Sequence, residues 1–205
     1  MKLSRVNTLL LVAIILINGY IIVLPVVPNL FFKPADPGSV RRSALEAKVY
    51  AGAGLQGNSD QNRLVMPSIL LDQQVFDGPN ANTLKKGLWH RPGTSTPDKG
   101  GNTVIAGHRL TYTNPRGALY HLDKVKPGDL IGLSWEGKNY AYTVTDVTVV
   151  TPDAVEIEAP SADPRLTIYT CTPLWLPKDR LVVVAVPEAK QPSAVDQTTR
   201  QGGSQ

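Results

Sequence analysis

The sequence predicts an all-β (mainly β) domain, a closed or nearly closed barrel of about eight short strands, preceded by one transmembrane helix. Three observations support this prediction. Short apolar runs separated by turn residues recur from Arg63 to Val186, a pattern typical of barrels. Gly and Pro, at 17 each in 205 residues, favour many turns. The span from Val6 to Phe32 carries no charge, and it exceeds the roughly 18–20 residues that cross a bilayer as a helix.

The N-terminus is predicted to be a membrane anchor. Lys2 and Arg5 precede the apolar span, so the positive-inside rule places residues 1–8 in the cytoplasm and the domain outside. We assign residues 9–28 to the transmembrane anchor. A cleaved signal peptide is the alternative, but its apolar region is usually about 7–15 residues long and ends at an A-x-A-like site, which is not evident here. We therefore expect a single-pass protein of the cell membrane with an extracellular domain.

The remaining boundaries follow from composition. Residues 29–62 are rich in Gly and Pro and are predicted to form a stalk or linker, with one short helical piece around 43–50. Residues 63–187 form the folded domain. Residues 188–205 lose apolar periodicity and carry Gln, Ser, Thr and Gly, so we predict a disordered tail.

The strands of the domain are predicted in chain order. Pro67 separates two short apolar runs, and Glu136-Gly137 indicates a hairpin. The last run is apolar on both faces, so it should be buried on both sides. A helical turn is expected at 117–123, and the expected strands are 64–66, 69–71, 103–106, 130–135, 140–150, 165–170 and 181–186.

Composition limits the partners and the use of the single thiol. The net charge of +4 is mild and no groove-binding motif is present, so no nucleic-acid partner is expected. Cys171 is the only cysteine, which excludes a disulfide framework within the chain. A free cysteine is often a small buried apolar residue. In an exported domain, however, an unused thiol risks oxidation, so Cys171 is also a candidate nucleophile.

A nucleophilic thiol needs a base and a group that stabilises an oxyanion. Of the three histidines, His90, His108 and His121, the best candidate base is His108, because it follows Gly107 at a strand end. There an imidazole can reach the rim of a barrel without crowding.

Arg180 begins the strand that follows the thiol, after a loop of eight residues from 172 to 179. Its fixed fork of donors suits a substrate carbonyl or an oxyanion. The alternative is a surface or strand-edge arginine paired with Asp179 or with a backbone carbonyl. A zinc site is the rival use of His90, His108, His121 and Cys171, but no C-x-x-C, H-E-x-x-H or other close ligand spacing is present.

Three pieces in order resemble the signature of the sortases, the cysteine transpeptidases of Gram-positive-type cell surfaces. They are Gly107-His108-Arg109, the stretch Thr167–Cys171, and Arg180. The family's T-L-x-T-C carries Ile168 at its second position here, a conservative departure. The runs 87–94, 101–108, 119–122 and 128–129 also resemble the family, so the resemblance covers roughly residues 64–186. The S-H-G-C-like setting of L,D-transpeptidases does not match.

The resemblance implies a sortase-type barrel that acts on an LPxTG-like sorting signal. Cys171 would attack the Thr–Gly carbonyl and form a thioester. His108 would protonate the leaving amine and later deprotonate the incoming one, and Arg180 would stabilise the oxyanion or position the substrate backbone. We expect Thr170 and Trp175 to contact substrate, although the first is equally typical of a strand and the second of a loop anchor.

The resemblance also limits cofactors and partners. The amine acceptor would belong to the cell wall or, in a pilus-assembling variant, to a lysine of another pilin subunit. A barrel that binds without catalysis is the alternative from another class. No cofactor is expected. Some relatives bind calcium through loop carboxylates, but the acidic residues of the corresponding region form no specific pattern here; they are Asp146, Asp153, Glu156 and Glu158.

Overall fold

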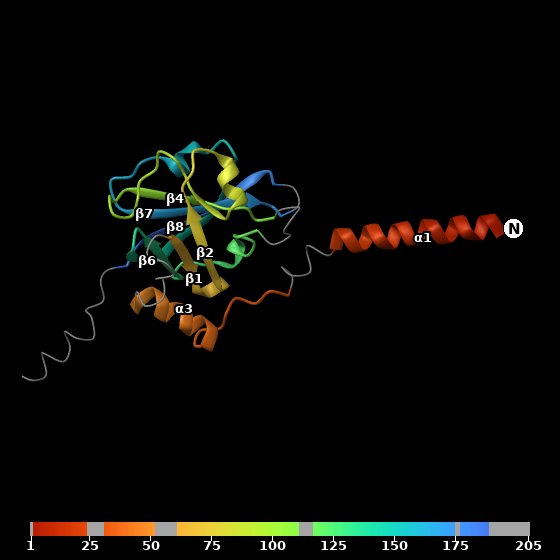
Figure 1. Ribbon diagram of the computed structural model, residues 1–205, viewed down its shortest axis with the longest axis horizontal. Coiled ribbons are helices and arrows are strands. Elements are labelled where there is room, and N and C mark those ends of the chain that lie inside the picture. Colours follow the sequence, from red (N-terminus) through yellow and green to blue (C-terminus); the bar gives the residue numbers. More distant parts are fainter. Residues whose placement is uncertain (1, 24–30, 52–60, 111–116, 175–176, 189–205) are drawn as a thin grey trace, which may run out of the picture.

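The computed structural model describes residues 2–23, 31–51, 61–110, 117–174 and 177–188. Within these residues, eight strands close into a barrel in the order β1-β2-β3-β4-β7-β8-β6-β5 (Figure 1). This confirms the predicted fold class. The strands are β1 (Arg63–Met66), β2 (Leu71–Phe76), β3 (Leu88–His90), β4 (Asn102–Ala106), β5 (Leu130–Trp135), β6 (Lys138–Val150), β7 (Arg165–Thr172) and β8 (Asp179–Pro187).

Short 3₁₀ helices occupy four of the connections. They are η1 (Pro67–Ile69), η2 (Ala81–Lys85), η3 (Leu122–Lys124) and η4 (Val155–Glu158). The predicted hairpin joins β5 to β6, and both of its turn residues have positive φ, 47° at Glu136 and 76° at Gly137. Two such residues give the backbone twist that a two-residue hairpin needs. The predicted helical turn after residue 117 ends in η3.

Two pairs of neighbouring strands are parallel, β2 with β3 and β4 with β7. The sequence patterns did not predict β3, because three residues are too few to show a period. The parallel pair β4–β7 matters most for the site, since both strands end at the same edge of the barrel. Its register is unbroken from Asn102 opposite Arg165 to Ala106 opposite Tyr169.

The barrel interior holds one continuous apolar core. Along β7, Leu166 and Ile168 are fully buried in it, as the period of two along a strand requires. On β8, Val182 and Val183 are both buried although they point to opposite faces. This confirms that the strand predicted to be apolar on both faces is covered on both sides over this stretch.

The N-terminal helix α1 (Lys2–Val23) contains 19 residues, Arg5–Val23, that are long and apolar enough to cross a membrane. None of this span is buried against the rest of the protein, and Figure 1 shows α1 extending away from the barrel. The helix includes residues 9–23 of the predicted anchor, whereas residues 24–28 lie outside the described residues. Of the predicted disordered tail, residues 189–205 lie outside them as well.

Part of the segment predicted as a stalk is packed on the domain. Helix α3 (Val40–Ala51) extends the helical piece expected around 43–50 and lies against the barrel below β1 (Figure 1). Its Leu45 and Val49, four residues apart, form a small buried cluster with Val65 of β1. Gly132 of β5 permits this contact, because a Cβ there would lie 2.6 Å from the Val49 side chain. A spacer between membrane and domain therefore cannot include α3.

Replacing Val49 with alanine is expected to lower the free energy of unfolding by about 2 kcal/mol, because two buried methyl groups are lost. Val40→Ala on the same helix is the matched control, since Val40 is 88% exposed. Thermal or urea unfolding of the two variants measures the difference. Equal stabilities would show that α3 does not depend on this contact.

Candidate active site

The ends of three neighbouring strands meet at one edge of the barrel. Where β4 ends, the Gly107 amide donates to the Tyr169 carbonyl of β7 at 3.2 Å. His108 follows at once, at the end of the barrel where β7 reaches Cys171. Strand β8 runs antiparallel to β7 and places Arg180 directly opposite Cys171. Directly opposed residues of an antiparallel pair project from the same face of the sheet.

Close packing under His108 explains the glycine that precedes it. A Cβ on Gly107 would lie 2.7 Å from a methyl carbon of Leu88 and 2.8 Å from the side chain of Leu119. Both leucines are fully buried, so neither can move aside cheaply. The absence of a side chain at position 107 lets the chain run against the core and present His108 at the rim.

His108, Cys171 and Arg180 line one open groove of about 370 Å³. The structure thus brings together the three residues predicted as catalytic, from the ends of β4, β7 and β8. The thiol is half-buried. The groove walls come largely from apolar and aromatic side chains of η2, β3 and the β6–β7 connection, namely Leu84, Trp89, Pro152, Ala154, Val155 and Ile157.

Of the two predicted substrate contacts, the structure describes only Thr170. Its side chain is 1% exposed and is absent from the groove lining, because it points to the opposite face of β7 from Cys171. Its hydroxyl donates to the Gly107 carbonyl at 2.8 Å. The backbone is therefore the part of Thr170 that is left to meet a substrate. Trp175 lies outside the described residues.

A polar cluster in the groove was not predicted from the sequence. The Tyr169 hydroxyl donates to Glu158 at 2.6 Å, and Arg91 Nε donates to the same carboxylate oxygen at 2.7 Å. The Arg91 guanidinium also lies 4.3 Å from the centre of the Trp89 ring. Together these contacts hold η4, in the middle of the β6–β7 connection, against β3 and β7. Burial, and then the hydrogen bond to Glu158, raise the pKa of Tyr169 above its ordinary value.

One signal for Tyr169 was present in the sequence. Residues 169 and 171 are two apart on one strand, and side chains at that spacing share a face. The period of two therefore puts Tyr169 beside the candidate nucleophile. The contact between Arg91 and Glu158 could not be predicted from the sequence, because it depends on how the β6–β7 connection folds back over the barrel.

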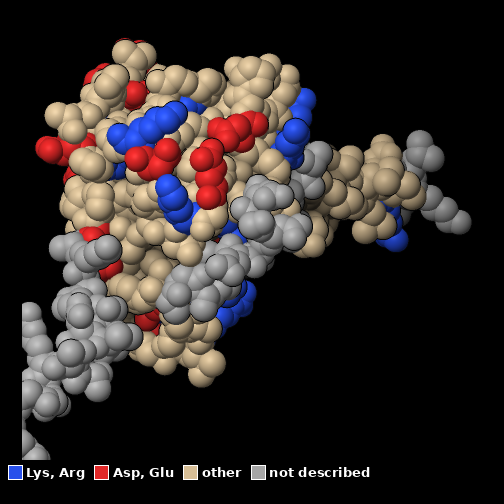
Figure 2. Space-filling model, turned by 60° about the vertical axis from the view of Figure 1, so that its left-hand side comes forward, with Lys and Arg blue, Asp and Glu red and all other residues tan. Residues whose placement is uncertain are grey.

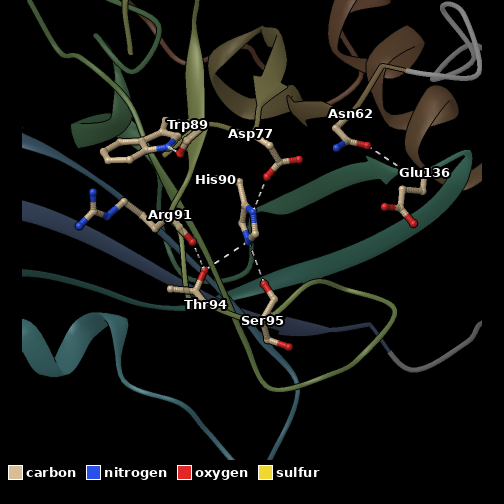
Figure 3. A network of polar contacts seen from close by, with 9 residues as sticks. Asn62, Asp77, Trp89, His90, Arg91, Thr94, Ser95 and Glu136 are labelled. Atoms are coloured by element: carbon tan, nitrogen blue, oxygen red, sulfur yellow. Dashed lines mark hydrogen bonds and ion pairs between the residues drawn. The ribbon is translucent and has the colours of Figure 1, made fainter. Parts of the chain in front are cut away.

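The other two histidines lie outside the groove lining. His90 is buried, with Nδ1 2.7 Å from Asp77 and Nε2 3.0 Å from the Ser95 carbonyl (Figure 3). These contacts join β3 to the two connections that flank it. The His121 ring stacks on Phe32, with centroids 3.6 Å apart. Both rings therefore have structural neighbours that account for their positions.

Among the described residues, no three His, Cys, Asp or Glu side chains gather closely enough to hold a metal ion. The alternative zinc site of three histidines and Cys171 is therefore not assembled there. Glu158, one of the carboxylates considered for calcium, is bound instead to Arg91 and Tyr169.

The charge distribution is mixed over the face drawn in Figure 2. Lys and Arg side chains lie beside Asp and Glu side chains on that face rather than in one field of a single sign. The groove itself has apolar walls together with the polar side chains of Arg91, Glu158 and Tyr169.

Comparison with known proteins gives a consistent result. A family model described as a sortase domain matches residues 64–188. Sortase D of Bacillus subtilis (strain 168) is 25% identical over 142 residues, which cover 69% of this chain and 69% of that protein. Sortase A of Bacillus anthracis is 29% identical over 134 residues, covering 65% of this chain and 62% of that protein.

Solved structures agree with the sequence relatives. The crystal structure of sortase C from Streptococcus pneumoniae aligns with a TM-score of 0.56 and 28% identity, covering 62% of this chain and 66% of that one. The family match spans more than half of the chain and includes all three residues that meet in the groove. The chain therefore belongs to the sortase family of cysteine transpeptidases.

Proposed function

We propose that the protein is a membrane-anchored sortase that cleaves an LPxTG-like sorting signal through a thioester on Cys171. The acyl group then passes to an amine, which anchors a surface protein to the cell wall. The observation that carries this proposal is the convergence of Cys171, His108 and Arg180 on one groove. Family membership supports the reaction type, and the roles proposed for the three residues are those that the resemblance to the family implies.

Cys171 is the nucleophile. Its sulfur attacks the carbonyl carbon of the Thr–Gly bond, and the resulting tetrahedral oxyanion collapses to a thioester as the C–N bond breaks. The released Gly amine leaves with a proton. An incoming amine then attacks the thioester carbonyl, loses a proton to His108, forms a new amide and releases the sulfur of Cys171 as the thiolate, the form in which it attacked.

His108 transfers both protons. It gives one to the leaving amine in the first half of the reaction and takes one from the acceptor amine in the second. A single imidazole can do both, because the second transfer restores the proton that the first one spent. Its place at the groove rim supports this role.

Arg180 stabilises the oxyanion or holds the substrate carbonyl. It lies directly opposite Cys171 on β8, next to the atom where negative charge develops. Its Nη1 donates at 3.2 Å to the backbone carbonyl of the adjacent Asp179. That contact is made to the main chain and not to the Asp179 carboxylate, so it leaves the guanidinium in the groove with its charge available.

Arg180→Ala is expected to lower kcat by about 10²–10³-fold, the usual effect of removing one oxyanion donor. Arg180→Lys keeps the charge but loses the planar fork, so it should recover only part of the rate. Peptide cleavage kinetics measure both. A rate within about threefold of wild type for Arg180→Ala would remove this residue from the mechanism.

The topology follows from the anchor. Lys2 and Arg5 precede the apolar part of α1, so the N-terminus is expected inside and the barrel outside, where sorting signals and cell-wall amines are found. A protease added to intact cells should then reach the barrel and leave the N-terminus protected.

The acceptor distinguishes two versions of the proposal. The pneumococcal sortase C structure was described as informing catalysis and pilin substrate specificity in that enzyme. Likeness to it supports, as the second candidate, a pilin-polymerising enzyme whose acceptor is a lysine side chain. Both versions use the same groove and the same thioester.

The test uses the full chain in detergent micelles, incubated with LPxTG-like peptides varied at each position. One arm adds a short cell-wall peptide amine and the other a lysine-containing pilin peptide. Mass spectrometry detects the acyl adduct on Cys171 and the new amide, and the arm that yields product identifies the acceptor. Peptide binding without an adduct would instead indicate a barrel that binds but does not catalyse.

A further inference from the structure

The residues that follow His108 and Cys171 are bonded to each other. Arg109 Nη1 donates to the Thr172 hydroxyl at 2.8 Å. The arginine is 6% exposed. Its Nη2 lies 3.0 Å from Asp123 of η3, and its Nε donates to the Tyr120 carbonyl at 3.4 Å. A buried guanidinium needs such partners, but Asp123 and Tyr120 both belong to the connection that follows β4. Thr172 is the partner that reaches across to β7.

The residues that precede the same pair are bonded as well. The Thr170 hydroxyl donates to the Gly107 carbonyl at 2.8 Å. His108 thus lies between two residues, each tied through a side chain to a neighbour of Cys171. We call these two contacts, Gly107–Thr170 and Arg109–Thr172, the bracket.

The bracket lies just beyond the point where the hydrogen-bonded ladder between β4 and β7 ends. The β4–β7 ladder ends with Ala106 opposite Tyr169, and the Gly107 amide makes a further bond to β7. Beyond that point the Gly107 carbonyl and the Arg109 guanidinium are the groups that tie the His108 segment to β7 in the described residues. Main-chain bonds hold the same segment to the turn that follows it, from the Leu119 amide to the His108 carbonyl and from the Gly117 amide to the Arg109 carbonyl. On the β7 side, beyond the ladder, its position depends on the two side-chain contacts.

We propose that Arg109 and Thr172 are positioning residues that set the separation and orientation of His108 relative to Cys171. This rests on the proposed function, in which the two groups act together. Reacting groups must be held within about 0.5 Å of their productive geometry, and a displacement of about 1 Å can cost about 10²-fold in rate. Neither Arg109 nor Thr172 has to touch substrate for this role.

Thr172→Val tests the proposal in the full chain in detergent micelles, since it removes the hydroxyl and keeps the shape. Thr167→Val is the matched control. It removes a hydroxyl on the same strand that also bonds toward β4, to Asn102 at 2.7 Å, and Thr167 does not line the groove. We expect Thr172→Val to lower kcat about tenfold or more with KM within about twofold, and Thr167→Val to leave kcat unchanged. Thr172→Ser, which restores the hydroxyl, should recover the rate.

A purely structural contact would behave differently. Thr172→Val and Thr167→Val would then both lower the melting temperature and leave kcat within about twofold of wild type, which overturns the proposal. Failure of Thr172→Ser to recover more rate than Thr172→Val also overturns it. Arg109→Met should lower kcat, and adding Thr172→Val to it should cause no further loss, because one contact is lost only once.

A substrate-free measurement separates this proposal from the proposed function. If wild type turns over none of the sorting peptides, the substrate assignment fails. The bracket is then tested by the rate at which iodoacetamide alkylates Cys171 across a pH series. The chain has one cysteine, so the label reports on that thiol alone. A pH profile for Thr172→Val that differs from those of wild type and Thr167→Val supports the bracket, and coincident profiles overturn it.

Discussion

Cys171→Ala is expected to abolish acyl-enzyme formation and peptide cleavage, the largest effect of any single substitution in the groove. Alanine has no nucleophilic atom, and no other cysteine exists in the chain to replace the thiol. The thiol is half-buried at the end of β7, so the smaller side chain should not disturb the barrel. Intact-mass spectrometry with an LPxTG-like peptide detects the adduct, and chromatography detects the cleaved product.

Two controls make this result decisive. The melting temperature of Cys171→Ala should remain close to that of wild type, which shows that lost activity is not lost folding. Peptide affinity should also persist, because the apolar groove walls are unchanged. Cleavage by the folded variant at the wild-type rate would contradict a thioester mechanism altogether.

His108→Ala is expected to lower kcat by about 10²–10⁴-fold, the range for loss of a general acid–base group. The acyl-enzyme step needs a proton for the leaving amine, and the second step needs one removed from the acceptor. The steady-state rate of peptide cleavage measures the first step, and the rate of transfer to the acceptor amine measures the second. Added imidazole should restore part of the activity if the cavity left by the side chain admits it.

His121→Ala is the matched control for this experiment. His121 stacks on Phe32 and does not line the groove, so its loss should affect stability more than kcat. The same holds for His90, which is held between Asp77 and the Ser95 carbonyl. If His121→Ala lowered kcat as strongly as His108→Ala, the assignment of the general acid–base group would be wrong.

The fold was predictable where a strand carries a clear apolar pattern or a recognisable turn. The expected strand 69–71 was wrong, because residues 67–69 form η1 and β2 runs from Leu71 to Phe76, with the polar run 72–74 interrupting its apolar pattern. The hairpin at Glu136-Gly137 and the doubly apolar β8 needed only local patterns, because turn chemistry and alternation act between close neighbours in the chain. Strand β3 and the parallel pairings did not show in the sequence. A three-residue strand has no measurable period, and parallel partners are chosen by packing across the barrel.

The packing of α3, in the segment before the domain, could not be predicted from local sequence patterns either. The short helical piece was visible in the sequence, but its attachment was not, because its buried contacts come from Leu45 and Val49 and their partners lie elsewhere in the chain. Gly132 leaves room for the Val49 side chain, but nothing in the sequence distinguishes it from any other glycine in a strand. Tertiary contact made a predicted linker part of the folded unit.

The sequence by itself determined the candidate chemistry: one thiol at a strand end, a histidine after a glycine at another, and an arginine that begins the next strand. Those positions are local properties of strands and turns. Only the tertiary structure decided that the three share one groove and that Arg109 reaches Thr172. The two bracket contacts join residues 63 apart in the chain, and they exist because closing the barrel brings β4 and β7 side by side.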